Sequence, residues 1–114
     1  MTAQNVELLA LGISEMNGAF VPKTEAFIFR NPGRLRSGGS LRQFTTISGG
    51  LKSLISELVR YEDKNQVVAV VANYGCDKVE KEFIFLDYLT RAFGRDIKRS
   101  TTLAQLESGA EEAE

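Results

Sequence analysis

The spacing of apolar residues along the chain predicts a helix near its start. Between residues 5 and 16, apolar side chains repeat every three or four positions, which places them on one helix face: Val6, Leu9, Ile13 and Met16. Asn17-Gly18 would end this helix, because both residues are common just past a helix C-terminus. A β-hairpin that turns at Asn17-Gly18 is the alternative interpretation.

Two further segments have helical spacing. Ser48 is a typical N-cap residue, and the pattern after it predicts an amphipathic helix over residues 49–62 through Leu51, Leu54, Ile55, Leu58 and Val59. A longer helix is expected from a cap at Asp77 to about Phe93, with Gly94 ending it. Its apolar face would comprise Val79, Phe83, Leu86, Leu89 and Phe93, widened by Ile84, Phe85 and Tyr88. A face this wide suits a central helix or a surface for a protein partner.

The segments between these helices are less clearly patterned. Residues 66–74 are rich in Val and fit a buried strand, although a short helix fits them as well. Asn31-Pro32-Gly33 predicts a type II turn, in which Pro takes the second position and Gly the positive φ that follows. We expect residues 34–36 to pair with 42–45 across a Ser-Gly-Gly-Ser turn. Pairing of 25–29 with 42–47 is the alternative.

Composition limits the classes of function. The chain has 114 residues, of which 43% are apolar, and this length fits one domain. It has no His and a single Cys, Cys76, so histidine-based nucleophiles, internal disulfides and the usual zinc sites are excluded. We expect no metal and no other cofactor. No secretory signal and no membrane-spanning run is visible in the sequence.

Charge is distributed unevenly around a net value of -1. Residues 23–60 carry seven Lys or Arg but only Glu25 and Glu57 as carboxylates, and four arginines surround the turn at positions 30, 34, 36 and 42. These arginines form either a ligand-facing loop with unpaired guanidinium groups or an ordinary solvated hairpin. A nucleic-acid-binding module would use them on phosphates, but the scarcity of Lys there and the acidic residues 107–114 argue against it. Residues 107–114 are expected to form a disordered acidic tail.

The order of these features resembles a known family. Lysozyme-like peptidoglycan-cleaving domains of phages and bacteria, grouped with lytic transglycosylases and virion lysins, carry an Asn-Asn-Pro-Gly-Asn-Leu-Arg signature. The resemblance covers about residues 5–95, and its residues here are Glu15, Asn31-Pro32-Gly33, Leu35-Arg36, Gly38-Gly39, Phe44, Gly50-Leu51, Leu54, Leu58, Tyr61 and Tyr74. Arg30 and Arg34 stand where the family has Asn. Gly75-Cys76-Asp77 stands where the family has Ala-Pro-Pro.

The resemblance implies a fold and a reaction. The fold would be mainly α with a small β-hairpin, as one lysozyme-like domain over residues 1–106, and residues 66–74 would be helical. Glu15 would be the general acid, since apolar shielding raises the pKa of a carboxyl group enough for this role. The arginine and glycine hairpin offers no second carboxylate, which favours a lytic transglycosylase that uses the acetamido group of its substrate. A muramidase that uses Glu25 or a held water ranks second.

The substrate-binding residues implied by the resemblance surround the turn. Arg34, Arg36 and Arg42 would meet carboxylates of the peptide stem, and Ser37, Gln43 and Thr45 would bind sugar or water. Tyr74 would line the groove, or lie in the core. Peptidoglycan is the expected partner, with a protein partner possible on residues 79–93 and neither membrane nor nucleic acid expected. Such a protein would be cytoplasmic or virion-associated and act on the cell wall. An inactive lysozyme-like assembly protein and an arginine-loop nucleic-acid-binding module are the alternatives.

Overall fold

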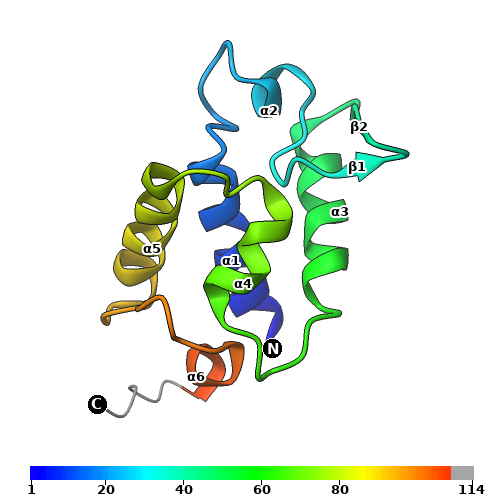
Figure 1. Ribbon diagram of the computed structural model, residues 1–114. Helices are drawn as coiled ribbons and strands as arrows, with labels where there is room; N and C mark the ends of the chain where they lie inside the picture. Colours follow the sequence, from blue (N-terminus) through cyan, green and yellow to red (C-terminus); the bar gives the residue numbers. More distant parts are fainter. Residues whose placement is uncertain (109–114) are drawn as a thin grey trace.

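The computed structural model describes residues 1–108, which form a group of helices with a small antiparallel sheet at one edge (Figure 1). The helices are α1 (Ala3–Met16), α2 (Glu25–Ile28), α3 (Ile47–Leu58), α4 (Val67–Val71), α5 (Val79–Phe93) and α6 (Leu103–Ser108), and a 3-10 turn, η1 (Ala72–Tyr74), follows α4. Strands β1 (Arg36–Ser37) and β2 (Ser40–Leu41) pair antiparallel. The prediction of a mainly α fold with a small β-hairpin is therefore confirmed.

Helix α1 forms where the apolar spacing predicts it. The Thr2 hydroxyl caps its first turn by accepting a hydrogen bond from the Asn5 N–H at 3.3 Å. Asn17 ends the helix, and Gly18 follows with φ +68°, so a hairpin at this point is ruled out. Helix α1 lies between α5 and α3 (Figure 1), and its Val6, Leu9 and Ile13 side chains are buried in the core.

Helix α3 begins before its predicted start. Thr46, not Ser48, is the N-cap, and its hydroxyl accepts a hydrogen bond from the Gly49 N–H at 3.0 Å. Both residues are suitable caps, and the extended backbone of Thr46 decides between them. The helix ends at Leu58, short of the predicted residue 62.

The Val-rich segment forms a helix and not a strand. Helix α4 and the turn η1 together occupy residues 67–74 and bury Val67, Val70, Val71 and Tyr74. Gly75 then adopts φ +91°, which ends the helical segment. The helical assignment that the resemblance implied is therefore confirmed, whereas local propensity alone favoured the strand.

Helix α5 turns a narrower face to the core than its pattern predicts. Lys78, not Asp77, holds the N-cap position, and Gly94 ends the helix at φ +69° as expected. Phe85 and Leu89 are fully buried, but Phe83 is 74% exposed and Val79 is 71% exposed. Apolar spacing identified the helix correctly, but it did not show which part of a wide apolar surface meets the core.

The hairpin is tighter than expected. Arg36 pairs with Leu41 and Ser37 with Ser40, around Gly38 and Gly39, which both have positive φ as a two-residue type I′ turn requires. One further bond, from the Arg42 N–H to the Leu35 carbonyl at 2.9 Å, continues the predicted pairing. The alternative pairing of 25–29 with 42–47 is limited to one bond among the described residues, from the Phe44 N–H to the Phe29 carbonyl.

The Asn31-Pro32-Gly33 turn has a different geometry from the one predicted. The Arg34 N–H closes it on the Asn31 carbonyl at 3.1 Å, but the positive φ falls at Arg34 (+50°) and not at Gly33. A type II turn is therefore the wrong assignment. Gly33 is required for space instead, since a Cβ there would stand 2.6 Å from the Leu54 side chain.

The side chain of Asn31 holds this loop together. Asn31 is 1% exposed, and its Nδ2 donates to the carbonyls of Leu35 and Arg42 at 2.9 Å each. Its Oδ1 accepts from the Leu35 N–H at 2.8 Å. A single buried amide thus satisfies three backbone groups and joins the turn to the chain leaving the hairpin.

A second buried amide, Asn17, ties this loop to the helices. Its Nδ2 donates to the Pro32 carbonyl at 2.9 Å and to the Tyr74 carbonyl at 2.8 Å. Its Oδ1 accepts from Lys81 Nζ at 3.4 Å. The end of α1, the loop, the end of η1 and the first turns of α5 therefore meet at one polar side chain.

The predicted acidic tail begins inside the described chain. Residues 107 and 108 close α6, where the Glu107 carboxylate accepts hydrogen bonds from Asn5 Nδ2 and the Thr2 N–H, both at 2.9 Å. These two donors hold the pKa of Glu107 below its ordinary value. The remainder of the predicted tail, residues 109–114, lies outside the described residues.

Replacing Gly50 by Ala should destabilise the fold. A Cβ at Gly50 would collide with the Arg30 carbonyl oxygen and stand 2.8 Å from the Pro32 ring, so α3 would have to move off the loop. We expect a loss of roughly 1–3 kcal/mol or more in the free energy of unfolding, measured by denaturant titration. Gly49→Ala is the matched control in the same helix, and it should be neutral or stabilising by up to about 1 kcal/mol. Equal effects of the two substitutions would contradict the close approach at Gly50.

Replacing Asn31 by Ala should also destabilise the fold. The substitution leaves the buried Leu35 N–H and the Arg42 carbonyl without the partner that Asn31 supplies, whereas the Leu35 carbonyl keeps its bond from the Arg42 N–H. Each unsatisfied buried group costs roughly 1–3 kcal/mol, so a loss of several kcal/mol is expected in the same titration. Asn73→Ala is a control, because Asn73 is exposed and its Nδ2 bonds carbonyls at 3.3 Å within its own helix. A small effect of Asn31→Ala would contradict the role given to this amide.

Candidate functional site

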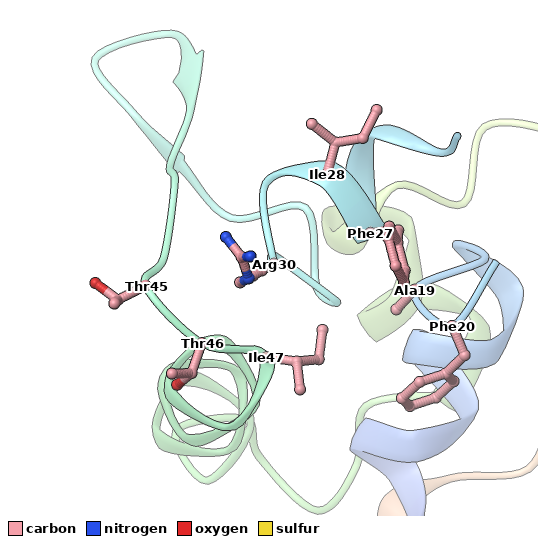
Figure 2. Close-up of a pocket in the computed structure, with 8 residues that line it drawn as sticks. All are labelled: Ala19, Phe20, Phe27, Ile28, Arg30, Thr45, Thr46 and Ile47. Carbon is pink, nitrogen blue, oxygen red and sulfur yellow. The ribbon is translucent and has the colours of Figure 1, made fainter. Parts of the chain in front are cut away.

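The first candidate site is a groove at the C-terminal end of α1. It has a volume of about 520 Å³ and is enclosed by the chain after α1, by α2 and by the start of α3 (Figure 2). Its lining residues are Ala19, Phe20, Phe27, Ile28, Arg30, Thr45, Thr46 and Ile47. Figure 2 shows Phe20 on the chain that follows α1, and Arg30 and Thr45 on the opposite side.

The groove combines exposed apolar surface with a few polar groups. Phe20 is 54% exposed, Ile28 is 53% exposed and Phe27 is 42% exposed, which is unusual for side chains this large. Arg30 and the Thr45 hydroxyl supply hydrogen-bond donors beside them. Aromatic faces with a small number of polar groups are typical of a ligand site, and flat apolar faces suit the C–H faces of a sugar ring.

Glu15 lies in the last turn of α1, before the residues that enter the groove. Its side chain is exposed, so the apolar shielding expected around it is absent in the protein alone. Met16 is buried in the core and does not cover it. Neither Glu15 nor any other carboxylate is among the residues that line this groove.

A second cavity gathers three of the predicted binding residues. It has a volume of about 340 Å³ and lies beside the Asn31 loop. Arg34, Arg36 and Tyr74 line it, together with Leu35, Glu57, Ala72, Asn73, Gly75 and Asp77. The structure therefore divides the predicted site, because Thr45 lines the first groove, and Arg34, Arg36 and Tyr74 line the second cavity.

Tyr74 lies in the core, and it is also among the residues that line the second cavity. Its ring is buried in the core at 3% exposure, and its hydroxyl donates to Glu57 Oε1 at 3.1 Å. Burial, then the neighbouring Tyr61 and the charge of Glu57, raise the pKa of Tyr74 well above its ordinary value. The hydroxyl therefore stays protonated near neutral pH and acts as a donor to Glu57.

Arg34 is paired, contrary to the interpretation of an unpaired loop. Its Nη1 lies 3.2 Å from Glu25 Oε1, and 20% of its side chain is exposed. The stem of Arg34 passes over Gly75, where a Cβ would stand 2.5 Å from Arg34 Cδ. This packing fixes the guanidinium group at the edge of the second cavity.

The other predicted residues are on the hairpin surface. Arg36 Nη1 donates to the Gly39 carbonyl at 2.9 Å, and the Arg42 guanidinium group lies 4.8 Å from the centre of the Phe44 ring. Ser37 and Gln43 are exposed, and they line neither cavity described above.

Glu57 and Asp77 are charged residues of the second cavity that the sequence did not single out as site residues. Asp77 pairs with Lys81 at 3.4 Å, and this cation lowers the pKa of the Asp77 carboxyl group. Glu57 lies on α3 between the buried Leu54 and Leu58. In the sequence, Glu57 stands out only as a carboxylate within the apolar pattern of an amphipathic helix, and this pattern could have marked it as a candidate site residue.

Other kinds of site receive no support from the described chain. Within residues 1–108, no cluster of three His, Cys, Asp or Glu side chains could hold a metal ion. No helix in this range is both long enough and apolar enough to cross a membrane. Burial raises the pKa of the Cys76 thiol, which keeps it protonated. Comparison with known protein families, curated proteins and solved structures finds no match to this chain.

Replacing Arg30 by Asn should stabilise the protein. Arg30 has φ +51°, a left-handed conformation that costs an ordinary L-residue roughly 1–2 kcal/mol, whereas Asn adopts it more readily. We expect Arg30→Asn to raise the free energy of unfolding by about 0.5–1 kcal/mol, because part of this cost is removed. Arg30→Ala removes the same side chain but keeps the unfavourable backbone conformation, so it should give no such gain. Equal stability of the two variants would contradict this explanation.

Proposed function

We propose that this chain is a lysozyme-like domain that binds the glycan strands of peptidoglycan and cleaves them with Glu15 as the general acid. The observation that carries the proposal is the geometry of the Asn31 loop. The family signature has Asn where this chain has Arg30 and Arg34, and these two positions have φ +51° and +50°. Asn is among the few residues that adopt this conformation readily. The backbone thus keeps the conformation that the signature favours, although the side chains have changed.

The remaining positions of the signature support the same proposal. Asn31 bonds three backbone groups, and Gly33 leaves room for Leu54. Leu35 is buried in the core, and Gly50 lies against the Arg30 carbonyl. Each residue therefore has a structural reason to be in the motif, which an accidental match in sequence would not require.

The first groove is the proposed position of the glycan strand. The groove lies beside the chain that follows α1, so a strand across Phe20 and Phe27 would have to extend beyond the lining residues to reach Glu15 in the last turn of α1. Bound sugar would cover Glu15 and exclude water from it. The shielding that raises the pKa of a catalytic carboxyl group would then come from the substrate.

The proposed reaction uses one carboxyl group. Glu15 donates its proton to the glycosidic oxygen as the bond from that oxygen to the anomeric carbon breaks, and the acetamido oxygen of the same sugar bonds to that carbon and takes up the positive charge. The C6 hydroxyl of the same sugar then attacks the anomeric carbon, the acetamido oxygen leaves, and the hydroxyl proton returns to the Glu15 carboxylate, which gives the 1,6-anhydro product and regenerates the acid. Glu25, the candidate second carboxylate of a muramidase, is paired with Arg34 and 60% of its side chain is exposed. A transglycosylase therefore remains the preferred form of the proposal.

An inactive lysozyme-like protein with a role in assembly is the second candidate. Two observations favour it: Glu15 is exposed, and the outer surface of α5 displays Phe83 and Val79. In that role the protein would use α5 for a protein partner and would cleave nothing.

Digestion of purified peptidoglycan by the wild type and by Glu15→Gln tests the proposal. We expect the wild type to release anhydro-muropeptides, detected by mass spectrometry, and Glu15→Gln to lower the rate at least 100-fold, since proton transfer contributes about 10²–10⁴-fold. Glu7→Gln is the matched control, because Glu7 is another exposed carboxylate of α1, and it should keep wild-type activity.

The other outcomes each have a clear meaning. Reducing-end products would indicate a muramidase. No release by a folded wild type, or equal release by Glu15→Gln, would contradict the proposal and favour the assembly role.

A further inference from the structure

We propose that the 340 Å³ cavity beside the Asn31 loop binds the peptide stem of peptidoglycan as a zwitterion, with its carboxylate on Arg34 and Arg36 and its ammonium group on Glu57 and Asp77. The proposal deepens the proposed function and rests on it for the identity of the ligand. The charges themselves are features of this chain, since the cavity lining holds two guanidinium groups and two carboxylates.

The cationic side of the cavity is held in position by its surroundings. The Arg34 stem is packed over Gly75, and one of its terminal nitrogens is occupied by Glu25. Arg36 uses Nη1 to bond Gly39 across the hairpin turn. A guanidinium group has five N–H donors, so both arginines retain donors for a carboxylate after these bonds are made.

The anionic side is held in position as well. The Tyr74 hydroxyl donates to Glu57 Oε1, which orients the carboxylate and leaves it acceptor capacity for an ammonium group. Asp77 also lines the cavity, but its carboxylate forms an ion pair with Lys81, with Oδ1 and Nζ 3.4 Å apart. Glu57 is therefore the main acceptor, and Asp77 adds a weaker attraction.

The balance of charge selects the class of ligand. Two cations alone would suit a phosphate or a nucleic acid, but Glu57 and Asp77 repel a purely anionic ligand. A ligand with a carboxylate and an ammonium group satisfies both sides at once. A cavity of about 340 Å³ has room for one amino-acid unit, and a peptide stem with a free diamino acid carries both groups on such a unit.

Binding of a soluble stem peptide tests the inference. The probe is the tripeptide L-alanyl-γ-D-glutamyl-meso-diaminopimelate, titrated calorimetrically into the full chain. It is compared with the same peptide acetylated on its amines and with the same peptide amidated on its carboxylates. We expect the unmodified peptide to bind and each modification to weaken binding at least 10-fold.

Variants assign the two ends of the ligand. Glu57→Gln keeps an oxygen that can accept a hydrogen bond from Tyr74, but it removes the negative charge. It should lower the affinity for the unmodified peptide about 10-fold and leave the already weaker affinity for the acetylated peptide unchanged. Arg36→Gln should likewise lower the affinity for the unmodified peptide about 10-fold and leave the affinity for the amidated peptide unchanged. Arg60→Gln removes an exposed guanidinium group that lies just after α3 and outside this cavity, and it should bind like the wild type. Unfolding curves of all three variants check that they fold.

The results separate this inference from the proposed function. Equal binding of the free and acetylated peptides, or wild-type binding by Glu57→Gln, would overturn the zwitterion site even if Glu15 cleaves peptidoglycan. Charge-dependent peptide binding by a chain that cleaves nothing would support the site and refute the catalytic function. Absence of binding by all three peptides would overturn the site.

Discussion

The arrangement of this protein depends on the buried side chain of Asn31. Burying an amide is unfavourable unless each of its polar atoms is satisfied, and here both atoms bond backbone groups of the loop and the hairpin. The loop therefore cannot rearrange locally without exposing or orphaning these groups. Asn17 extends the constraint, because it joins the same loop to the ends of α1 and η1. The two cavities lie on either side of this rigid segment.

This loop supplies one arginine to the lining of each cavity. Arg30, which directly precedes Asn31, lines the first groove. Arg34, at the end of the turn that begins at Asn31, lines the second cavity. Both arginines have positive φ, so their side chains leave the loop in directions that a regular helix or strand would not give. Arg at these positions adopts the left-handed conformation at some energetic cost. It also directs one cation toward each cavity.

Apolar spacing predicted the helices because helix formation is local, but the finer errors have tertiary causes. Thr46 and Ser48 are both good caps, and only the backbone of the folded chain selects Thr46. Gly33 suggested a positive φ, yet its real constraint is Leu54, which lies far away in sequence. The apolar surface of α5 is wider than its contact with the core, since α1 meets Phe85 through Gly12 and leaves Phe83 exposed. Steric fit between distant residues is not encoded in a local pattern.

For a similar reason, the sequence pointed to only some of the charged residues that line the second cavity. Clustered arginines without neighbouring carboxylates are visible in the sequence, so Arg34 and Arg36 were identified. Their partners come from α3 and from the chain before α5, which no spacing rule connects to the turn. Tyr74 positions Glu57 at the cavity, because its ring is buried in the core and its hydroxyl donates a hydrogen bond to the Glu57 carboxylate. A cavity that combines both signs of charge distinguishes a zwitterion from a simple anion, and the arginines alone would not.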